Sequence, residues 1–121
     1  MYRRRFERLV SRALRDLPRW VSDLLDNVAV VVEEEPTPEE VASTGLPPDD
    51  SLFGLYQGVP RTERTSSYGM VLPDKITIYQ GPIERFCRSD QQIVYEIKRT
   101  VVHELAHHFG LSEDDMRRLR R

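Results

Sequence analysis

The chain has 121 residues, of which 39% are hydrophobic, and a formal net charge of −2. This length suits one domain with a modest core and excludes two independent ones, so we expect a single domain over residues 1–121. The single cysteine, Cys87, excludes an intramolecular disulfide, and the longest apolar run, residues 28–32, is too short to cross a membrane.

The N-terminal segment is basic and amphipathic. Apolar residues recur there at helical spacing and predict a helix with arginines on its outer face: Phe6, Leu9, Val10, Ala13, Leu14 and Leu17. Pro18 breaks this helix and begins a second short one that extends to about Leu25. A row of arginines can bind nucleic acid or membrane phosphates. Glu7 and Asp16 interrupt the row and no aromatic residues alternate with it, so we expect neither a nucleic-acid nor a membrane partner.

Three short segments have the character of β-strands, namely residues 27–32, 52–57 and 75–80. The first is a β-branched run suited to a buried strand, and the third alternates strictly between apolar and polar residues. Gly81 and Pro82 are expected to end the third strand. Residues 36–51 are rich in proline and acids and predict an exposed loop, with one helical turn near residues 38–41.

A longer helix is predicted between Ser89 and Gly110. Ser89 and Gln92 have the spacing of a capping box, and Gly110 suits the left-handed conformation after a helix end. One face is apolar and should be buried: Ile93, Val94, Ile97, Val101, Leu105 and Ala106. A second face is polar and should line a cleft: Glu96, Arg99, Thr100, His103 and His107.

The polar face carries the motif H-E-x-x-H at His103, Glu104 and His107. Two histidines four residues apart lie on one face of a helix and can both bind one zinc ion. Glu104, about a quarter-turn away, can accept a proton from a zinc-bound water without binding the metal itself. His108 lies off this face, which favours a supporting role over a ligand role.

The segment after Gly110 supplies candidates for a third ligand. Ser112 followed by three acids predicts a short helix through Arg121, and the turn at Gly110 directs its start towards the histidines. A third protein ligand would leave one position for water, as in catalytic zinc sites. Glu113 is the leading candidate and Asp114 the alternative, although acids at a helix start also stabilise the helix dipole.

The stretch His103-Glu104-x-x-His107-x-x-Gly110-x-x-Glu113 resembles the extended zincin motif, with glutamate where metzincins have histidine. Together with the upstream LPDKITIYQGPI, it resembles a small bacterial family of zincin-like metallopeptidases, the minimal zincins, over residues 27–121. This resemblance implies an α+β, minimal zincin-like fold. Its parts would be N-terminal helices, a small three- to four-stranded mixed sheet, an active-site helix and a short C-terminal helix. No Met-turn segment follows the third ligand, which departs from metzincins.

The expected function is therefore zinc-dependent hydrolysis of a peptide or protein substrate, with one Zn2+ per chain. By analogy with zincins, the substrate would pair as a strand with residues 52–57, expected at the sheet edge, and Tyr68 is a candidate for oxyanion stabilisation. The alternatives are a non-catalytic metal-binding interaction module and a nucleic-acid binder that uses the arginines. No signal segment is visible, which leads us to expect a cytoplasmic protein. Composition does not determine the oligomeric state.

Overall fold

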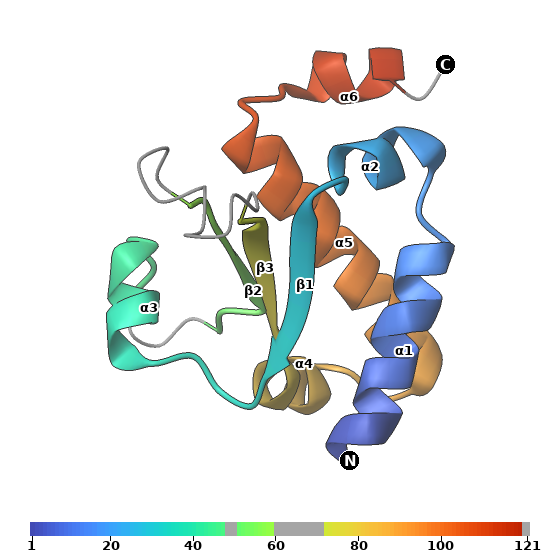
Figure 1. Cartoon of the computed structure of the whole chain (residues 1–121). Helices are drawn as coiled ribbons and strands as arrows, with labels where there is room; N and C mark the ends of the chain where they lie inside the picture. Colours follow the sequence, from blue (N-terminus) through green and yellow to red (C-terminus); the bar gives the residue numbers. More distant parts are fainter. Residues whose placement is uncertain (48–50, 60–71, 120–121) are drawn as a thin grey trace.

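The structure is a computed structural model that describes residues 1–47, 51–59 and 72–119. In these residues six α-helices surround a three-stranded mixed sheet, so the predicted α+β fold is confirmed (Figure 1). The helices are α1 (Arg3–Arg15), α2 (Arg19–Leu24), α3 (Pro38–Ser43), α4 (Gln80–Phe86), α5 (Asp90–His108) and α6 (Glu113–Leu119), and the strands are β1 (Val28–Glu33), β2 (Gly54–Gln57) and β3 (Asp74–Tyr79).

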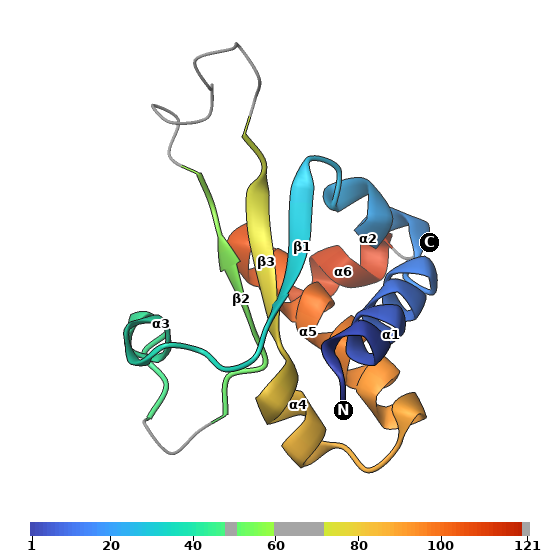
Figure 2. The same ribbon diagram turned by 60° about the horizontal axis from the view of Figure 1, so that its bottom comes forward.

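The strand order is β1-β3-β2, with β1 parallel and β2 antiparallel to the central strand β3. Strand β2 therefore lies at an edge of the sheet, as predicted for residues 52–57. Helix α3 lies beside β2, on the far side of the sheet from α1 and α2 (Figure 2). Since β2 begins at Gly54, the predicted strand was two residues too long at its N-terminal end.

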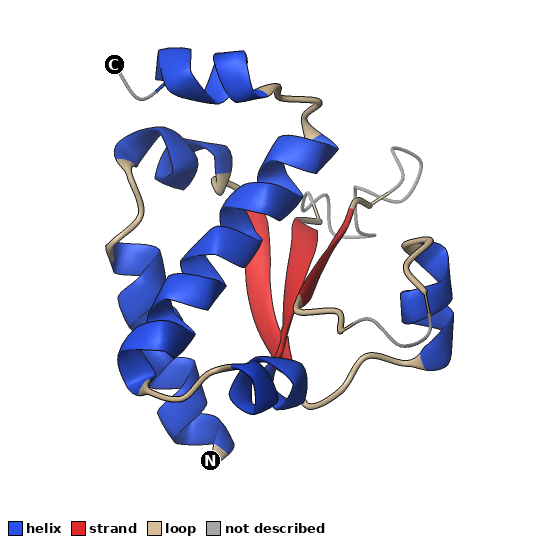
Figure 3. Cartoon of the chain, turned by 180° about the vertical axis from the view of Figure 1, so that it is seen from behind, coloured by secondary structure: helices blue, strands red, loops and turns tan. Residues whose placement is uncertain are grey.

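The core lies between the sheet and the helices α1, α2 and α5. Seen from behind, α1 and α5 cover the same face of the sheet (Figure 3). Ile76 and Ile78 of β3 pack there with Phe6 of α1 and Ile97 of α5, and all four side chains are fully buried. Burial of each such side chain stabilises the fold by about 1.5–3 kcal/mol relative to its exposure. All six residues of the predicted apolar face of α5 are buried, which fixes the rotation of this helix.

Two details of the helices differ from the predictions. Gly81 and Pro82 were expected to end a strand, but β3 passes directly into α4 and both residues belong to this helix. Pro82 is tolerated because it lies in the first turn, where a backbone N–H has no partner within the helix. The helical turn near residues 38–41 is a complete short helix, α3, whose N-terminus has a full capping box between Thr37 and Glu40.

No helix in the described part of the chain is long and apolar enough to span a membrane.

Candidate active site

Helix α5 places the H-E-x-x-H motif in its last two turns. The helix begins where Ser89 Oγ accepts a hydrogen bond from the N–H of Gln92 at 3.1 Å, as predicted. Gln92 does not complete the capping box, because its side chain accepts from the N–H of Arg88 instead. The helix ends in a Schellman motif, in which Gly110 has a φ of +65° and Leu111 N donates to Ala106 O at 2.8 Å. This ending fixes the place where the chain turns after the histidines.

His103 and His107 are both exposed on α5, whereas Glu104 is half-buried. The two imidazoles stand about one helical turn apart on α5: His107 lines the cavity along residues 55–57, and His103 lies near residues 52–54. Two other members of the predicted polar face, Glu96 and Thr100, are buried. The polar face that we expected to line a cleft is therefore partly covered, and at Thr100 the covering element is β2.

The close approach of β2 to α5 occurs at Gly54. A Cβ atom at this position would lie 2.5 Å from Thr100 Cγ2 and 3.0 Å from the carbonyl oxygen of Thr77. Any side chain would therefore push the strand away from the helix. Glycine at position 54 allows the backbone of β2 to rest on the helix that carries the motif.

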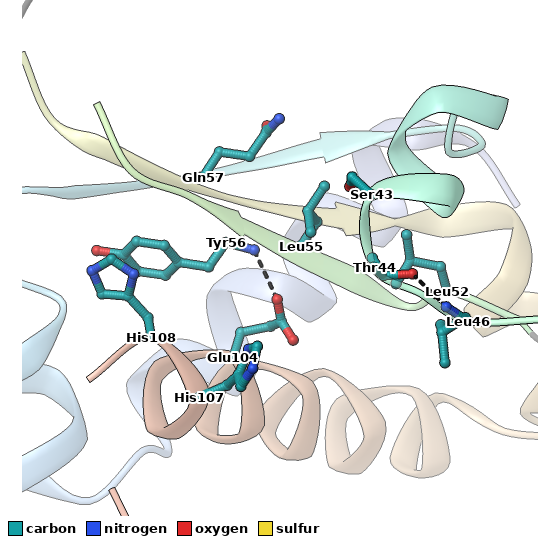
Figure 4. Close-up of a pocket in the computed structure, with 10 residues that line it drawn as sticks. All are labelled: Ser43, Thr44, Leu46, Leu52, Leu55, Tyr56, Gln57, Glu104, His107 and His108. Carbon is teal, nitrogen blue, oxygen red and sulfur yellow. Dashed lines mark hydrogen bonds between the residues drawn. The ribbon is translucent and has the colours of Figure 1, made fainter. Parts of the chain in front are cut away.

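This approach brings the edge strand to the glutamate of the motif. The backbone N–H of Tyr56 donates a hydrogen bond to Glu104 Oε1 at 2.8 Å (Figure 4). The bond uses one oxygen of the carboxylate and fixes the orientation of the side chain. Glu104 is thus held between α5 and an edge strand, and within the residues that the structure describes its second oxygen makes no hydrogen bond.

The side chain of Tyr56 forms a second connection between the strand and the helix. Its hydroxyl donates to Asp74 Oδ2 at 2.6 Å, and its ring stacks on His108 with the ring centroids 3.9 Å apart. Asp74 is 7% exposed, accepts from Val59 N at 2.9 Å and has its Oδ2 3.9 Å from His108 Nε2. His108 therefore contacts both Tyr56 and Asp74, and the supporting role expected for it stays a prediction.

A cavity of about 540 Å³ extends along the outer edge of β2 beside Glu104 and His107. Its walls come from α5, from β2 and from the end of α3 (Figure 4). The lining residues are Ser43, Thr44, Leu46, Leu52, Leu55, Tyr56, Gln57, Glu104, His107 and His108. This cavity brings together the predicted base Glu104, the predicted ligand His107 and the edge strand β2.

The third predicted ligand, Glu113, lies at the start of α6, and it lines a cavity of about 350 Å³ together with His103. The carboxylate of the alternative, Asp114, is paired with Arg117. Asp115 and Ser112 bind each other: Ser112 N donates to Asp115 Oδ2 at 2.9 Å, and Asp115 N donates to Ser112 Oγ at 3.1 Å. The bond from the Ser112 backbone, then the Ser112 side chain and the charge of Arg118, lower the pKa of the Asp115 carboxyl. Of the three acids, Glu113 is the one that faces a cavity shared with a histidine of the motif.

The donor set fits zinc through its two imidazoles, which are the nitrogen ligands that zinc prefers. The three predicted ligands are not gathered around one point: within residues 1–47, 51–59 and 72–119, no group of three His, Cys, Asp or Glu side chains could hold a metal ion. Glu113 belongs to α6, and a short turn at Gly110 joins α6 to α5. For Glu113 to act as the third ligand, the start of α6 would have to lie closer to His103.

Sequence reasoning did not identify Gly54, Tyr56 or Asp74 as parts of the site. A glycine inside a strand pattern does indicate close backbone approach, so Gly54 could have been found. Tyr56 and Asp74 carry no local signal, because their contact depends on the register between β2 and β3. Tyr68, the candidate for oxyanion stabilisation, lies outside the described residues.

A helix with H-E-x-x-H beneath the edge strand of a small mixed sheet is an arrangement typical of proteins built around this metal-binding motif. The chain belongs to the zincin-like metallopeptidase family, whose model matches residues 25–121. The chain is also similar to the solved structure of a conserved hypothetical protein from Thermo thermophilus. The two share 26% sequence identity with a TM-score of 0.57, over 90% of this chain and 94% of that chain. No curated protein matches the chain.

Proposed function

We propose that the protein is a zinc-dependent peptidase in which Glu104 acts as general base. The observation that carries this proposal is the hydrogen bond from Tyr56 N to Glu104 Oε1, because it sets the carboxylate of the motif beside an edge strand and an open cavity. Membership in the zincin-like metallopeptidase family supports the same reaction class.

His103 and His107 would hold the zinc ion, with Glu113 as the third protein ligand. Glu113 is favoured because it lines a cavity together with His103. Asp114, the alternative ligand, is disfavoured because its carboxylate is paired with Arg117. When held there, zinc would supply Lewis-acid chemistry: it would lower the pKa of a water to about 7 and would polarise the substrate carbonyl.

The chain's own residues perform the remaining tasks. Glu104 accepts the proton of the water as the water oxygen attacks the carbonyl carbon, and delivers that proton to the nitrogen as the C–N bond breaks. The edge of β2 aligns the peptide backbone through hydrogen bonds. Tyr56 and His108 keep β2 and α5 in contact, so that Glu104 stays within reach of the bound peptide.

The test combines metal analysis with proteolysis. Protein purified without chelator should contain one zinc per chain, and incubation with a broad peptide library should give new peptide ends by mass spectrometry. The variant His107→Ala should lose both zinc and cleavage, whereas Arg88→Ala, on the exposed segment before α5, should keep both. Absence of metal in the wild type would refute the proposal. Bound zinc without cleavage of any peptide would favour the non-catalytic metal-binding module.

A further inference from the structure

We infer that the cavity between His103 and α6 binds a carboxylate of the peptide substrate through Lys98 and Arg99. This inference rests on the proposed function and names the charge of its substrate. It follows from the residues that line the cavity, from their ion pairs and from the position of the cavity relative to Glu104.

The cavity lies against the flank of α5 and has a volume of about 350 Å³. Its walls come from α5, from α6 and from the segment that joins α1 to α2 (Figure 3). Leu17, Val102 and Met116 supply apolar surface to these walls. A charged group bound against apolar surface is partly removed from water, which strengthens its attraction to an opposite charge.

Two cationic side chains of α5 border the cavity, Lys98 and Arg99. Lys98 is half-buried, and it forms no hydrogen bond or ion pair with any residue that the structure describes. The side chain of Arg99 is 53% exposed, and its Nη1 atom lies 3.6 Å from Oε1 of the buried Glu96. This distance is longer than a hydrogen bond, so the guanidinium keeps its N–H groups for a ligand. Ammonium and guanidinium groups both form charge-assisted hydrogen bonds with carboxylates.

The acids near the cavity leave one of these cations without a counter-ion. Glu96 offsets the charge of Arg99. Of the residues that the structure describes, Glu113 is the one acid that lines the cavity, and the proposed function assigns its carboxylate to zinc. Among these residues, Lys98 is therefore the half-buried charge that lacks an opposite one. A carboxylate of the substrate would supply it, whereas a cationic side chain would be repelled.

This cavity adjoins the candidate active site at His103. A smaller cavity of about 180 Å³ has Glu104 in its wall and shares Arg99 and His103 with the larger one. Residue 99 precedes residue 103 by about 6 Å along the helix, and long side chains lean towards the helix N-terminus. The cationic groups thus lie roughly two or three residues of an extended peptide away from His103. The carboxylate would belong either to an acidic side chain at that distance from the scissile bond or to the C-terminus of the peptide.

The experiment measures peptide binding separately from cleavage. The probes are fluorescein-labelled peptides Ser-Thr-Leu-Xaa-Leu-Thr-Ser, titrated with the zinc-loaded Glu104→Gln variant and followed by fluorescence anisotropy. Three peptides carry a C-terminal amide and have Glu, Gln or Lys at Xaa, and a fourth has Gln at Xaa and a free C-terminal carboxylate.

We expect a carboxylate to tighten binding about five- to tenfold relative to the amidated Gln peptide, as for one partly exposed ion pair. Tighter binding of the Glu peptide identifies a side chain as the source of the carboxylate, and tighter binding of the fourth peptide identifies the C-terminus. Equal binding of all four peptides, or no binding of any, would overturn the inference.

Charge changes at Lys98 test the location. In Lys98→Gln the preference for a carboxylate should disappear, in Lys98→Arg it should persist, and in Lys98→Glu the Lys peptide should bind more tightly than the Glu peptide. The matched change is Lys75→Gln, at an exposed lysine on β3 that lines neither cavity, and it should leave the preference unaltered. Equal loss of preference in Lys98→Gln and Lys75→Gln would show that the overall charge of the protein, and not this cavity, attracts the peptide.

The outcomes separate this inference from the proposed function. Tighter binding of a carboxylate peptide without cleavage of any peptide by the wild type would refute the peptidase and leave the carboxylate site standing. Cleavage without any preference for a carboxylate would do the reverse. If both hold, the cleavage sites in the peptide library should have an acidic residue or the C-terminus roughly two or three residues from the cleaved bond, on one side of it.

Discussion

Gly54 permits the contact between β2 and α5, so the change Gly54→Ala should damage both stability and the site. The new Cβ would lie 2.5 Å from Thr100 Cγ2, and carbon atoms in contact are normally about 3.5–4.0 Å apart. The strand and the helix must therefore separate by about 1 Å. Overpacking of this kind typically costs about 1–3 kcal/mol in the free energy of unfolding, measurable as a lower midpoint in urea denaturation.

The same separation should disturb Glu104 beyond its effect on stability. The hydrogen bond from Tyr56 N to Glu104 Oε1 is 2.8 Å long, and a displacement of about 1 Å takes it beyond hydrogen-bond range. A misplacement of this size at a catalytic group can reduce turnover about a hundredfold. We expect kcat/KM for a cleaved library peptide to fall by this order, while zinc content is unchanged because the histidines belong to α5 alone.

A matched glycine and a compensating change make this prediction decisive. At Gly58 the nearest atom to an added Cβ is His108 Cε1 at 3.6 Å, an ordinary contact, so Gly58→Ala should leave stability within about 0.5 kcal/mol of the wild type. In the double variant Gly54→Ala/Thr100→Ala the Thr100 methyl is gone, and part of the stability should return. If Gly54→Ala is as stable and as active as Gly58→Ala, the close approach of β2 to α5 is not what positions Glu104.

Three further predictions concern the surroundings of the site. Tyr56→Phe keeps the ring stacked on His108 but removes the hydroxyl bond to the buried Asp74, so the free energy of unfolding should fall by about 1–3 kcal/mol in urea denaturation, and an unchanged midpoint would contradict this role. Glu113→Ala should weaken zinc binding at least about tenfold in a competition titration with a chelator, and Asp114→Ala should not; the reverse result would make Asp114 the third ligand. The pKa of the Asp115 carboxyl is lower in the folded chain than in the unfolded chain, where it is about 3.9. The ionised carboxylate therefore stabilises the start of α6 at pH values above about 3.9, and this stabilisation is lost as the pH falls through the folded pKa. In the wild type, the chemical shift of the Ser112 amide should change with pH as Asp115 is protonated. If the same pH-dependent change occurs in Asp115→Asn, another group causes it.

The helices and strands could largely be predicted because their signals are local. The apolar face of α5, the serine before it and the glycine after it lie within one continuous segment, and all three have the predicted roles. Helix α4 was missed because Gly81 and Pro82 normally mark the end of an element. Their actual role depends on β3 leading straight into a helix, which the dipeptide itself does not encode.

The site could be predicted only where its residues are neighbours in sequence. His103, Glu104 and His107 form one motif on one helix. The partners that orient Glu104 come from β2 and β3, and Tyr56 and Asp74 meet only because the antiparallel register brings them together. Gly54 lies inside the predicted strand 52–57, and only the position of Thr100 shows why a glycine is needed there. Contacts between distant segments follow from packing, and a single sequence contains no periodicity that reports them.

The most direct test of the central claim compares wild type and Glu104→Gln at equal zinc content, with a library peptide that the wild type cleaves. Glutamine keeps the shape of the side chain and can still accept from Tyr56 N, but it cannot take a proton from water. The account predicts that zinc remains at one per chain while the cleavage rate falls by about 10²–10⁴. Cleavage by Glu104→Gln at the wild-type rate would contradict the assignment of Glu104 as general base.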